Sequence, residues 1–512
     1  MKHSWLLALI LLFANVYAQD TPNTIIVNAD SGKYTISKYI YGHFTEHLGR
    51  CIYGGIWVGE KSSIPNIRGI RKDVLDALKE LHVPVVRWPG GCFADTYHWM
   101  DGIGPYKNRP KFVNTTWGGV VEDNSFGTHE FLDFCELLGT EPYICLNVGS
   151  GTVREAREWI EYVTSNNDSP MANLRKKNGR EKPWNVKFWG IGNETWGCGG
   201  NMTPEYYSNL YKQFSTFCLG EFKIYSGGTS DDLQWTDVAM KSLQNYRHLI
   251  QGYSYHYYTI CHTWDKKGSA VNFDEHEWFN TMKMTWFVDE NLMMHSKIMD
   301  QYDPEKKIAL IADEWGNWFD TEPGDNPAFL YQQNTLRDAV TAALYLNIFN
   351  NHCDRVKMAN LAQMVNVLQS VILTKDTAMV LTPTYYVFKM YAVHQDATLL
   401  PVDVQCDEYS DGAEKIPSLS VSASKDAKGT IHISIANLDP INSKNLSCAL
   451  RGVQASSVRA SIITAEKMNA YNDFSKPAEV TIAPFDDVQL ENQTLRLQLP
   501  SKCVVTVEVQ QK

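Results

Sequence analysis

One stretch near the N-terminus carries residue types that bind zinc in other proteins. The letters "HFTEH", from His43 to His47, fit the pattern H-x-x-E-H, in which two histidines four residues apart and a neighbouring glutamate serve a metal site. The stretch follows a strand-like "KYIYG" and runs into "LGRCIYGG", whose three glycines disfavour the helix that such a site needs. We therefore expect no metal site here, and a zinc hydrolase is the weakest alternative.

Two glutamates elsewhere suit a different chemistry. Glu194 ends the apolar run "VKFWGIGNE", and Glu314 lies at the end of "KIALIADEW". When two carboxylates face one pocket, one can protonate the oxygen of a glycosidic bond while the other attacks the anomeric carbon. Either glutamate alone would read as an ordinary solvated loop charge. The pair, each beside a tryptophan, indicates glycoside hydrolysis.

The elements that must position these glutamates alternate between residues 39 and 385. Short apolar runs are separated there by amphipathic, helix-like segments such as "RKDVLDALKELH". The eight runs are 38–44, 83–91, 141–149, 186–194, 222–228, 252–258, 307–315 and 356–363. This alternation predicts a (β/α)₈ barrel, an α/β fold whose working residues sit at the carboxyl ends of the strands. A doubly wound open sheet is the alternative, but no G-x-G-x-x-G follows the first run.

The segment 386–512 has a different pattern of apolar and polar residues. Its apolar residues alternate with polar ones in runs such as "LSVSAS", "TIHISIANL" and "CVVTVEV", with turn residues between them. That period of two predicts an additional antiparallel β-sandwich, jelly-roll-like, after the barrel. Residues 19–38 contain the strand-like "NTIIVNADSGKYTIS", which we expect to join the same sheets.

Composition and the N-terminus narrow the class of protein. The net charge of -11 over 512 residues disfavours nucleic acid as a partner. Residues 1–18 combine a basic start, a short apolar run and an A-x-A-like end, which is typical of a signal peptide. No later run is apolar and long enough to span a bilayer. We therefore expect an exported protein, periplasmic or secreted. The eleven cysteines are too scattered for a disulfide scaffold, so most are expected to be small buried hydrophobes.

Five motifs in order resemble one enzyme family. The motifs are "YGHFTEHLGRCIYGGIW", "RWPGGCFADTYHW", "GIGNETWGCGG", "DEWGNW" and "LAQMVNVLQ", and together they are similar to the family 51 α-L-arabinofuranosidases, retaining glycosidases with catalytic residues after strands four and seven. The resemblance implies that Glu194 is the general acid/base and Glu314 the nucleophile. It implies no metal and no other cofactor.

The same resemblance implies further pocket residues. Glu46 is expected to bind furanose hydroxyls, Asn193 to reach the sugar 2-hydroxyl, and Tyr258 to donate a hydrogen bond to Glu314. The other positions expected to line the sugar site are Cys92, Trp117, His256, Trp318 and Gln363. An ordinary packing role stays open for Cys92 and Trp318. Asp313 is expected to point away from the pocket, because neighbouring strand residues face opposite sides.

The expected function is that of an exo-acting α-L-arabinofuranosidase on hemicellulose or pectic side chains. An endo-glucanase or β-xylosidase on the same frame is one rival, and a deep pocket in place of an open cleft would separate them. A carbohydrate-binding protein without catalysis is another rival, although both Glu194 and Glu314 are present. The expected partner is an oligo- or polysaccharide containing arabinofuranose. The family often forms oligomers, so a homo-oligomer is also an open expectation.

Overall fold

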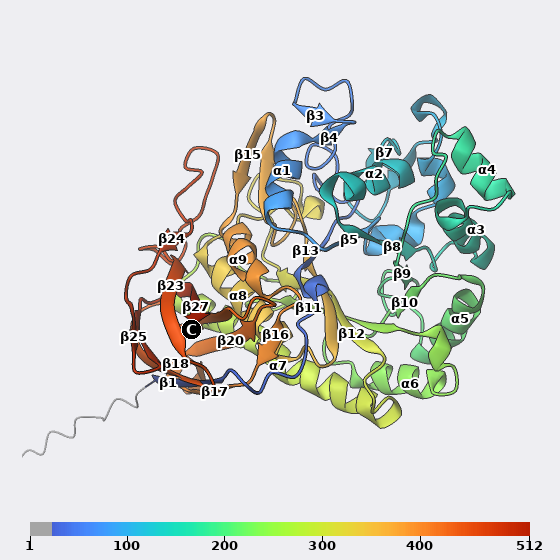
Figure 1. The fold of residues 1–512 in the computed structure, drawn as a ribbon. Helices are drawn as coiled ribbons and strands as arrows, with labels where there is room; N and C mark the ends of the chain where they lie inside the picture. Colours follow the sequence, from blue (N-terminus) through green and yellow to red (C-terminus); the bar gives the residue numbers. More distant parts are fainter. Residues whose placement is uncertain (1–22) are drawn as a thin grey trace, which may run out of the picture.

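A closed barrel and a two-sheet sandwich lie side by side in the computed structural model, which describes residues 23–512 (Figure 1). The segment interpreted as a signal peptide, residues 1–18, lies outside the described residues. Within the described range, no helix combines the length and apolar character needed to cross a membrane.

The barrel strands are eight and all parallel, as the eight apolar runs predicted. They are β2 (Gly42–Phe44), β5 (Val85–Trp88), β8 (Glu141–Leu146), β9 (Phe188–Ile191), β10 (Phe222–Tyr225), β11 (Gly252–Thr259), β12 (Ala309–Asn317) and β13 (Val356–Ala362). Each strand pairs with the next in chain order, and β13 closes the ring against β2. One buried apolar residue from most of these strands, such as Val85, Ile224 and Ile311, fills the barrel interior.

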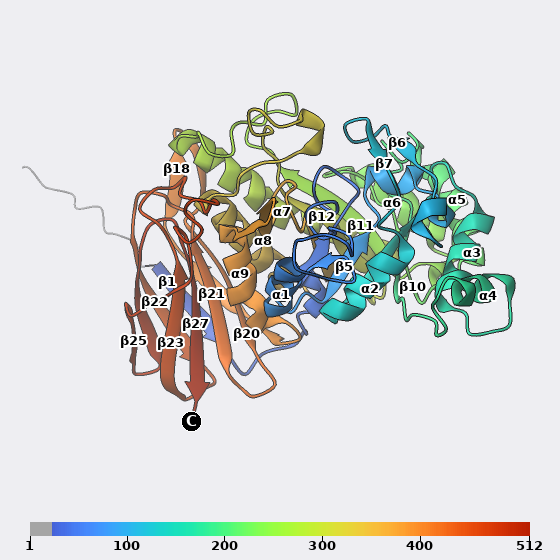
Figure 2. The same cartoon turned by 90° about the horizontal axis from the view of Figure 1, so that it is seen from above.

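Nine α-helices accompany these strands in the described part of the chain. They are α1 (Lys72–Glu80), α2 (Thr128–Leu138), α3 (Val153–Thr164), α4 (Pro170–Lys177), α5 (Pro204–Phe217), α6 (Leu233–Leu243), α7 (Glu275–Tyr302), α8 (Leu336–Asn351) and α9 (Pro383–Tyr391). Helix α8 is buried on nearly all sides, because it contacts barrel strand β12 and also the sandwich (Figure 2). A helix without a solvated face reads as apolar all round, as "AVTAALYLNIF" does.

The sandwich has one sheet of five strands and one of six. The first contains β17 (Val402–Gln405), β1 (Asn23–Asn28), β22 (Lys444–Arg451), β26 (Thr494–Leu499) and β25 (Val488–Glu491). The second contains β16 (Thr398–Leu400), β20 (Leu419–Lys425), β21 (Ile431–Asn437), β27 (Cys503–Gln511), β23 (Ala455–Ile463) and β24 (Ala483–Pro484). Strand β1 lies between β17 and β22 and runs parallel to β22, so this sheet is not purely antiparallel. Inward residues of both sheets form a separate apolar core.

The loops contain two-stranded ribbons and 3-10 turns. Four two-stranded ribbons are β3 (Asn66–Ile67) with β4 (Ile70–Arg71), β6 (Phe112–Asn114) with β7 (Val120–Glu122), β14 (Ile372–Lys375) with β15 (Ala378–Leu381), and β18 (Glu408–Asp411) with β19 (Glu414–Pro417). Single 3-10 turns are η1 (Lys38–Tyr41), η2 (Cys92–Thr96), η3 (Trp99–Gly102), η4 (Tyr106–Asn108), η5 (Arg247–Leu249), η6 (Pro327–Phe329) and η7 (Ala392–His394).

Strand β12 contains a bulge just before its functional end. Tyr255 of β11 pairs with Ala312, but the next residue, His256, pairs with Glu314. Asp313 is therefore the extra residue, and a bulge of this kind re-aims the side chains that follow it.

Candidate active site

A cavity of about 660 Å³ opens at the carboxyl ends of the barrel strands. Nine of the ten residues predicted for the site line it: Glu46, Cys92, Trp117, Glu194, His256, Tyr258, Glu314, Trp318 and Gln363. They come from the ends of different strands and from the loops that follow, which the closed barrel brings to one face. The tenth, Asn193, is buried beside the cavity and does not line it.

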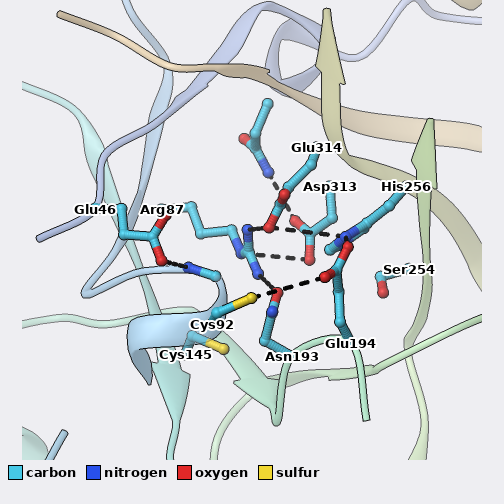
Figure 3. Close-up of polar contacts among 12 residues, drawn as sticks. Glu46, Arg87, Cys92, Cys145, Asn193, Glu194, Ser254, His256, Asp313 and Glu314 are labelled. Carbon is cyan, nitrogen blue, oxygen red and sulfur yellow. Dashed lines mark hydrogen bonds and ion pairs between the residues drawn. The ribbon is translucent and has the colours of Figure 1, made fainter. Parts of the chain in front are cut away.

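The two glutamates approach each other in the wall of this cavity. One carboxylate oxygen of Glu194 and one of Glu314 lie within 4.8 Å, and a His256 nitrogen lies within the same distance of both (Figure 3). Retaining glycosidases hold their carboxyl groups about 5–5.5 Å apart, whereas inverting ones need roughly 6.5–9.5 Å to admit a water. The spacing fits a double displacement.

Glu314 is surrounded by donors. Arg87 Nη1 donates to its Oε1 at 2.7 Å, and Tyr258 Oη donates to its Oε2 at 2.7 Å. Burial alone raises the pKa of Glu314, but His256, Arg87 and Tyr258 outweigh burial and lower that pKa below its ordinary value. Glu314 is therefore ionised at neutral pH, as a nucleophile must be.

His256 lies between the two carboxylates. Its Nδ1 is 3.0 Å from Glu194 Oε1 and 3.7 Å from Glu314 Oε1. Burial lowers the pKa of His256, but the charges of Glu314 and Glu194 outweigh burial and raise it. This environment favours the imidazolium, which can hold a proton next to Glu194.

Arg87 connects the site to the barrel interior and was missed by the sequence analysis. Its Nε lies 3.5 Å from Asp313, while its Nη2 donates to the side-chain oxygen of Asn193. Asp313 also accepts hydrogen bonds from Tyr143 and Asn360. As expected, Asp313 does not line the cavity, but it does not face the opposite side of the strand from Glu314, because the bulge in β12 leaves both carboxylates in contact with the same guanidinium (Figure 3).

A buried carboxylate fixes the turn that carries Glu194. Glu194 has a left-handed backbone, with φ of 39°, which a side chain adopts only when its surroundings impose it. Asp95 Oδ2 accepts from the N–H of Asn193 at 3.1 Å, and its Oδ1 accepts from the N–H groups of Val148 and Gly149, both at 2.8 Å. Asp95 therefore ties together the loops after β5, β8 and β9.

Glu46 is held by four donors at the edge of the cavity. Its Oε1 accepts from two backbone N–H groups of the loop after β5 and from Trp117 Nε1, each at 3.0 Å. Gln363 Nε2 donates to its Oε2 at 3.0 Å. Burial, followed by the charge of Glu314, raises the pKa of Glu46 to about 7.

The H-x-x-E-H pattern does not form a metal centre. His43 packs on Phe388 with ring centroids 4.7 Å apart, and burial lowers its pKa to about 3. His47 stacks on Phe93 at 4.6 Å instead. Among the described residues, the groups able to converge on one ion do not include this trio. Strand β2 directs Glu46 into the cavity while the two histidines pack elsewhere.

Cys92 forms a disulfide with Cys198, a pairing not expected from the sequence. The Sγ atoms of Cys198 and Cys92 lie 3.5 and 3.9 Å from Glu194 Oε2. The other nine cysteines are free, and eight of them are buried as expected. The bridge joins the loop after β5 to the loop after β9 at the wall of the cavity.

Aromatic side chains form the rim. Trp318 packs edge-on against Tyr258 at 5.0 Å and against Trp264 at 5.1 Å. Trp264 belongs to the loop between β11 and α7 and is 61% exposed, although it lines the cavity.

Two protein-family models and several named proteins match this chain. Residues 77–268 match the family model described as Alpha-L-arabinofuranosidase 1 domain, and residues 313–502 match the one described as Alpha-L-arabinofuranosidase C-terminal domain. The chain is 54% identical over 517 residues to the "Intracellular exo-alpha-L-arabinofuranosidase" of Bacteroides ovatus, with 100% of both chains covered. It is 34% identical to the "Probable alpha-L-arabinofuranosidase C" of Aspergillus niger, covering 90% of this chain and 92% of that protein.

The relative from Bacteroides ovatus contradicts the predicted export. Its name places it inside the cell, and the alignment covers both chains completely, the N-terminal segment included. The prediction of a periplasmic or secreted protein is therefore wrong by this comparison. A basic start and a short apolar run are compositional features only, and they do not by themselves specify export.

Solved structures of arabinofuranosidases also superpose on this chain. The GH51 arabinofuranosidase from Xanthomonas axonopodis pv. citri superposes with a TM-score of 0.94 at 46% identity, covering 96% of this chain and 100% of that one. The α-L-arabinofuranosidase from Thermotoga maritima, solved as an arabinose complex, superposes with a TM-score of 0.84 at 32% identity, with the same coverage. With a barrel, a cavity and a glutamate pair of this kind, the chain belongs to the family 51 α-L-arabinofuranosidases.

Proposed function

We propose that the protein is an exo-acting, retaining α-L-arabinofuranosidase. It removes terminal non-reducing α-L-arabinofuranosyl residues from hemicellulose or pectic arabinan-type oligosaccharides by double displacement. The observation that carries the proposal is the pair Glu194 and Glu314, with carboxylate oxygens within 4.8 Å in one cavity and different surroundings.

In the first displacement Glu314 attacks the anomeric carbon while the leaving oxygen takes a proton from Glu194. Arg87 and Tyr258 keep the attacking carboxylate ionised and fix its orientation. The proton is held on the Glu194–His256 pair, whose closest atoms are 3.0 Å apart. Proton delivery from a group so positioned contributes about 10²–10⁴-fold to such a reaction.

In the second displacement water attacks the glycosyl ester. Esterification removes the negative charge of Glu314, and Glu194 then accepts a proton from the attacking water. Because both attacks occur at one carbon from opposite faces, the product keeps the anomeric configuration of the substrate. No step calls for a metal ion or another cofactor.

The remaining side chains bind the sugar. Glu46 presents an oxygen whose partner is Gln363, and both can exchange hydrogen bonds with furanose hydroxyls. Arg87 engages the oxygen of Asn193, and the amide nitrogen of Asn193, which lies 3.9 Å from Cys198 Sγ, is the proposed donor for the 2-hydroxyl. Trp117 and Trp318 give apolar walls for the ring faces.

The substrate that the protein prefers distinguishes an arabinofuranosidase from another glycosidase or a carbohydrate-binding protein. Initial rates are to be measured on the 4-nitrophenyl glycosides of α-L-arabinofuranose, β-D-xylose and β-D-glucose, each with and without EDTA. We expect the arabinofuranoside to be preferred and EDTA to have no effect. A preference for the xyloside or glucoside would support another glycosidase on the same frame, and binding without turnover of any of them would support a carbohydrate-binding protein.

A further inference from the structure

The Cys92–Cys198 disulfide is the one disulfide among the described residues, which include all eleven cysteines. It lies at the wall of the catalytic cavity, and Cys198 is exposed while Cys92 is half-buried. A small dithiol entering the cavity can therefore reach the bridge, since exchange requires access to a sulfur atom.

Both sulfurs face the same carboxylate. Cys198 Sγ and Cys92 Sγ lie 3.5 and 3.9 Å from Glu194 Oε2, and one ligand atom from each of the three residues falls within 4.8 Å of the others. In the disulfide these sulfurs carry no hydrogen and are poor metal ligands. As thiolates they become the ligands that zinc prefers, and a carboxylate oxygen completes a common donor set.

We propose that reduction of the Cys92–Cys198 disulfide creates a zinc site formed by the two thiolates and Glu194, and that filling this site stops hydrolysis. In the reductive step a dithiol gives two electrons and two protons: the S–S bond breaks, two cysteine thiols form, and the dithiol closes to its own cyclic disulfide. Binding of Zn²⁺ then displaces the two thiol protons.

The geometry accommodates the ion with small movements. Zinc–sulfur bonds of about 2.3 Å at tetrahedral angles separate two sulfurs by about 3.8 Å. The two Cα atoms are 5.5 Å apart, so rotation of the side chains can open the sulfurs to that distance. Three protein ligands leave the fourth position for water, an arrangement usual for zinc with an open site. Two thiolates and one carboxylate together carry more negative charge than Zn²⁺ carries positive charge. Their attraction stabilises the ion in its partly buried position.

Occupation of this site affects catalysis through Glu194. A carboxylate oxygen bound to zinc holds no proton for the leaving group. This consequence rests on the proposed function of Glu194 as acid/base, whereas zinc binding itself does not. Measuring both quantities therefore separates failure of the site from failure of the proposed function.

The test uses the full chain in two redox states. One sample is left oxidised, and the other is reduced with a dithiol that is then removed under anaerobic conditions. Zinc binding is measured by isothermal titration calorimetry, circular dichroism reports folding, and hydrolysis of 4-nitrophenyl α-L-arabinofuranoside is followed in parallel. We expect one additional equivalent of Zn²⁺ on the reduced protein. We also expect at least a tenfold fall in kcat/KM that appears only with zinc and is reversed by EDTA.

Three variants locate the ion. Cys198→Ser and Cys92→Ser each leave one thiol, and the additional equivalent should be lost in both. A second group, Cys261 with His262 and Glu277, also brings one ligand atom from each residue within 4.8 Å of the others, so Cys261→Ser is the matched control and should keep the additional equivalent.

Four outcomes would overturn the proposal. They are equal zinc binding by both redox states, retention of the additional equivalent in the Cys92 and Cys198 variants, its loss in Cys261→Ser, and inactivation or unfolding by reduction alone without zinc. If the additional equivalent binds as expected but Glu194→Gln is fully active, the zinc site stands and the role of Glu194 in the proposed function fails.

Discussion

Arg87 donates to Glu314 Oε1 at 2.7 Å from a fully buried position beneath the cavity. The same guanidinium holds the side chain of Asn193 and lies 3.5 Å from Asp313. Burial lowers the pKa of Arg87, but the charges of Asp313 and Glu314 outweigh burial and raise it, so the cation persists. One residue thus orders Glu314, Asn193 and Asp313.

Replacing Arg87 should cost both stability and activity. Arg87→Met leaves the carboxylates of Asp313 and Glu314 buried without their cation, and breaking such a pair costs about 3–5 kcal/mol of unfolding free energy. Urea denaturation and kcat/KM are to be measured on the same preparations. Arg109→Met is the control, because Arg109 forms a buried ion pair with Glu130 at 2.9 Å outside this cavity. Equal losses of activity in both variants would show that Arg87 acts only through stability.

Tyr258 should set the acid limb of the pH profile. Its hydroxyl stabilises the charged form of Glu314, so Tyr258→Phe raises the pKa of Glu314 and keeps the nucleophile protonated to higher pH. The acid limb of kcat/KM should then move to higher pH, and the rate at the optimum should fall roughly 10- to 100-fold for the lost hydrogen bond to a charged group. Tyr257→Phe removes a hydroxyl that donates to the backbone of Met284 and should leave that limb in place. If the acid limb of kcat/KM does not move in Tyr258→Phe, then the Tyr258 hydroxyl does not control the ionisation of Glu314.

Glu46 should make stability depend on pH. Its pKa is raised from 4.5 to about 7 in the folded protein, so the folded chain keeps a proton that the unfolded chain releases. The unfolding free energy must then fall as pH rises through this window, by about 3 kcal/mol in all. Glu46→Gln has no such proton, so its stability relative to the natural chain should improve by that amount between pH 5 and pH 8. A constant difference measured by urea denaturation across this range would show that Glu46 titrates normally.

The barrel could be predicted from sequence because its buried parallel strands are short apolar runs, and Glu194 and Glu314 end two of these runs. The bulge in β12 could not, since one extra residue leaves no mark in the pattern of "IALIADEWGN". Strict alternation therefore misplaces the Asp313 side chain relative to Glu314, although Asp313 does stay out of the cavity. Arg87 did leave a signal, because it is the one charged residue in the apolar run 83–91.

The disulfide and the turn at Glu194 depend on contacts between distant loops. Cys92 and Cys198 are 106 residues apart, and only the closed barrel brings the loops after β5 and β9 together. The same holds for Asp95, whose three backbone donors come from two other loops. Nothing in the local sequence marks such partners, whereas a resemblance to a family can carry over only the residues that its motifs contain.

Glu194 is assigned as the acid/base and Glu314 as the nucleophile. The anomeric configuration of azide products tests these two roles most directly. Glu194→Ala and Glu314→Ala are each given 4-nitrophenyl α-L-arabinofuranoside and sodium azide, and the anomeric configuration of the arabinofuranosyl azide is read by NMR. In Glu194→Ala the azide attacks the ester on Glu314 after one displacement, so the product should retain the α configuration. In Glu314→Ala it attacks the substrate itself, so the product should be inverted. Inversion from Glu194→Ala with retention from Glu314→Ala would exchange the two roles and contradict the account.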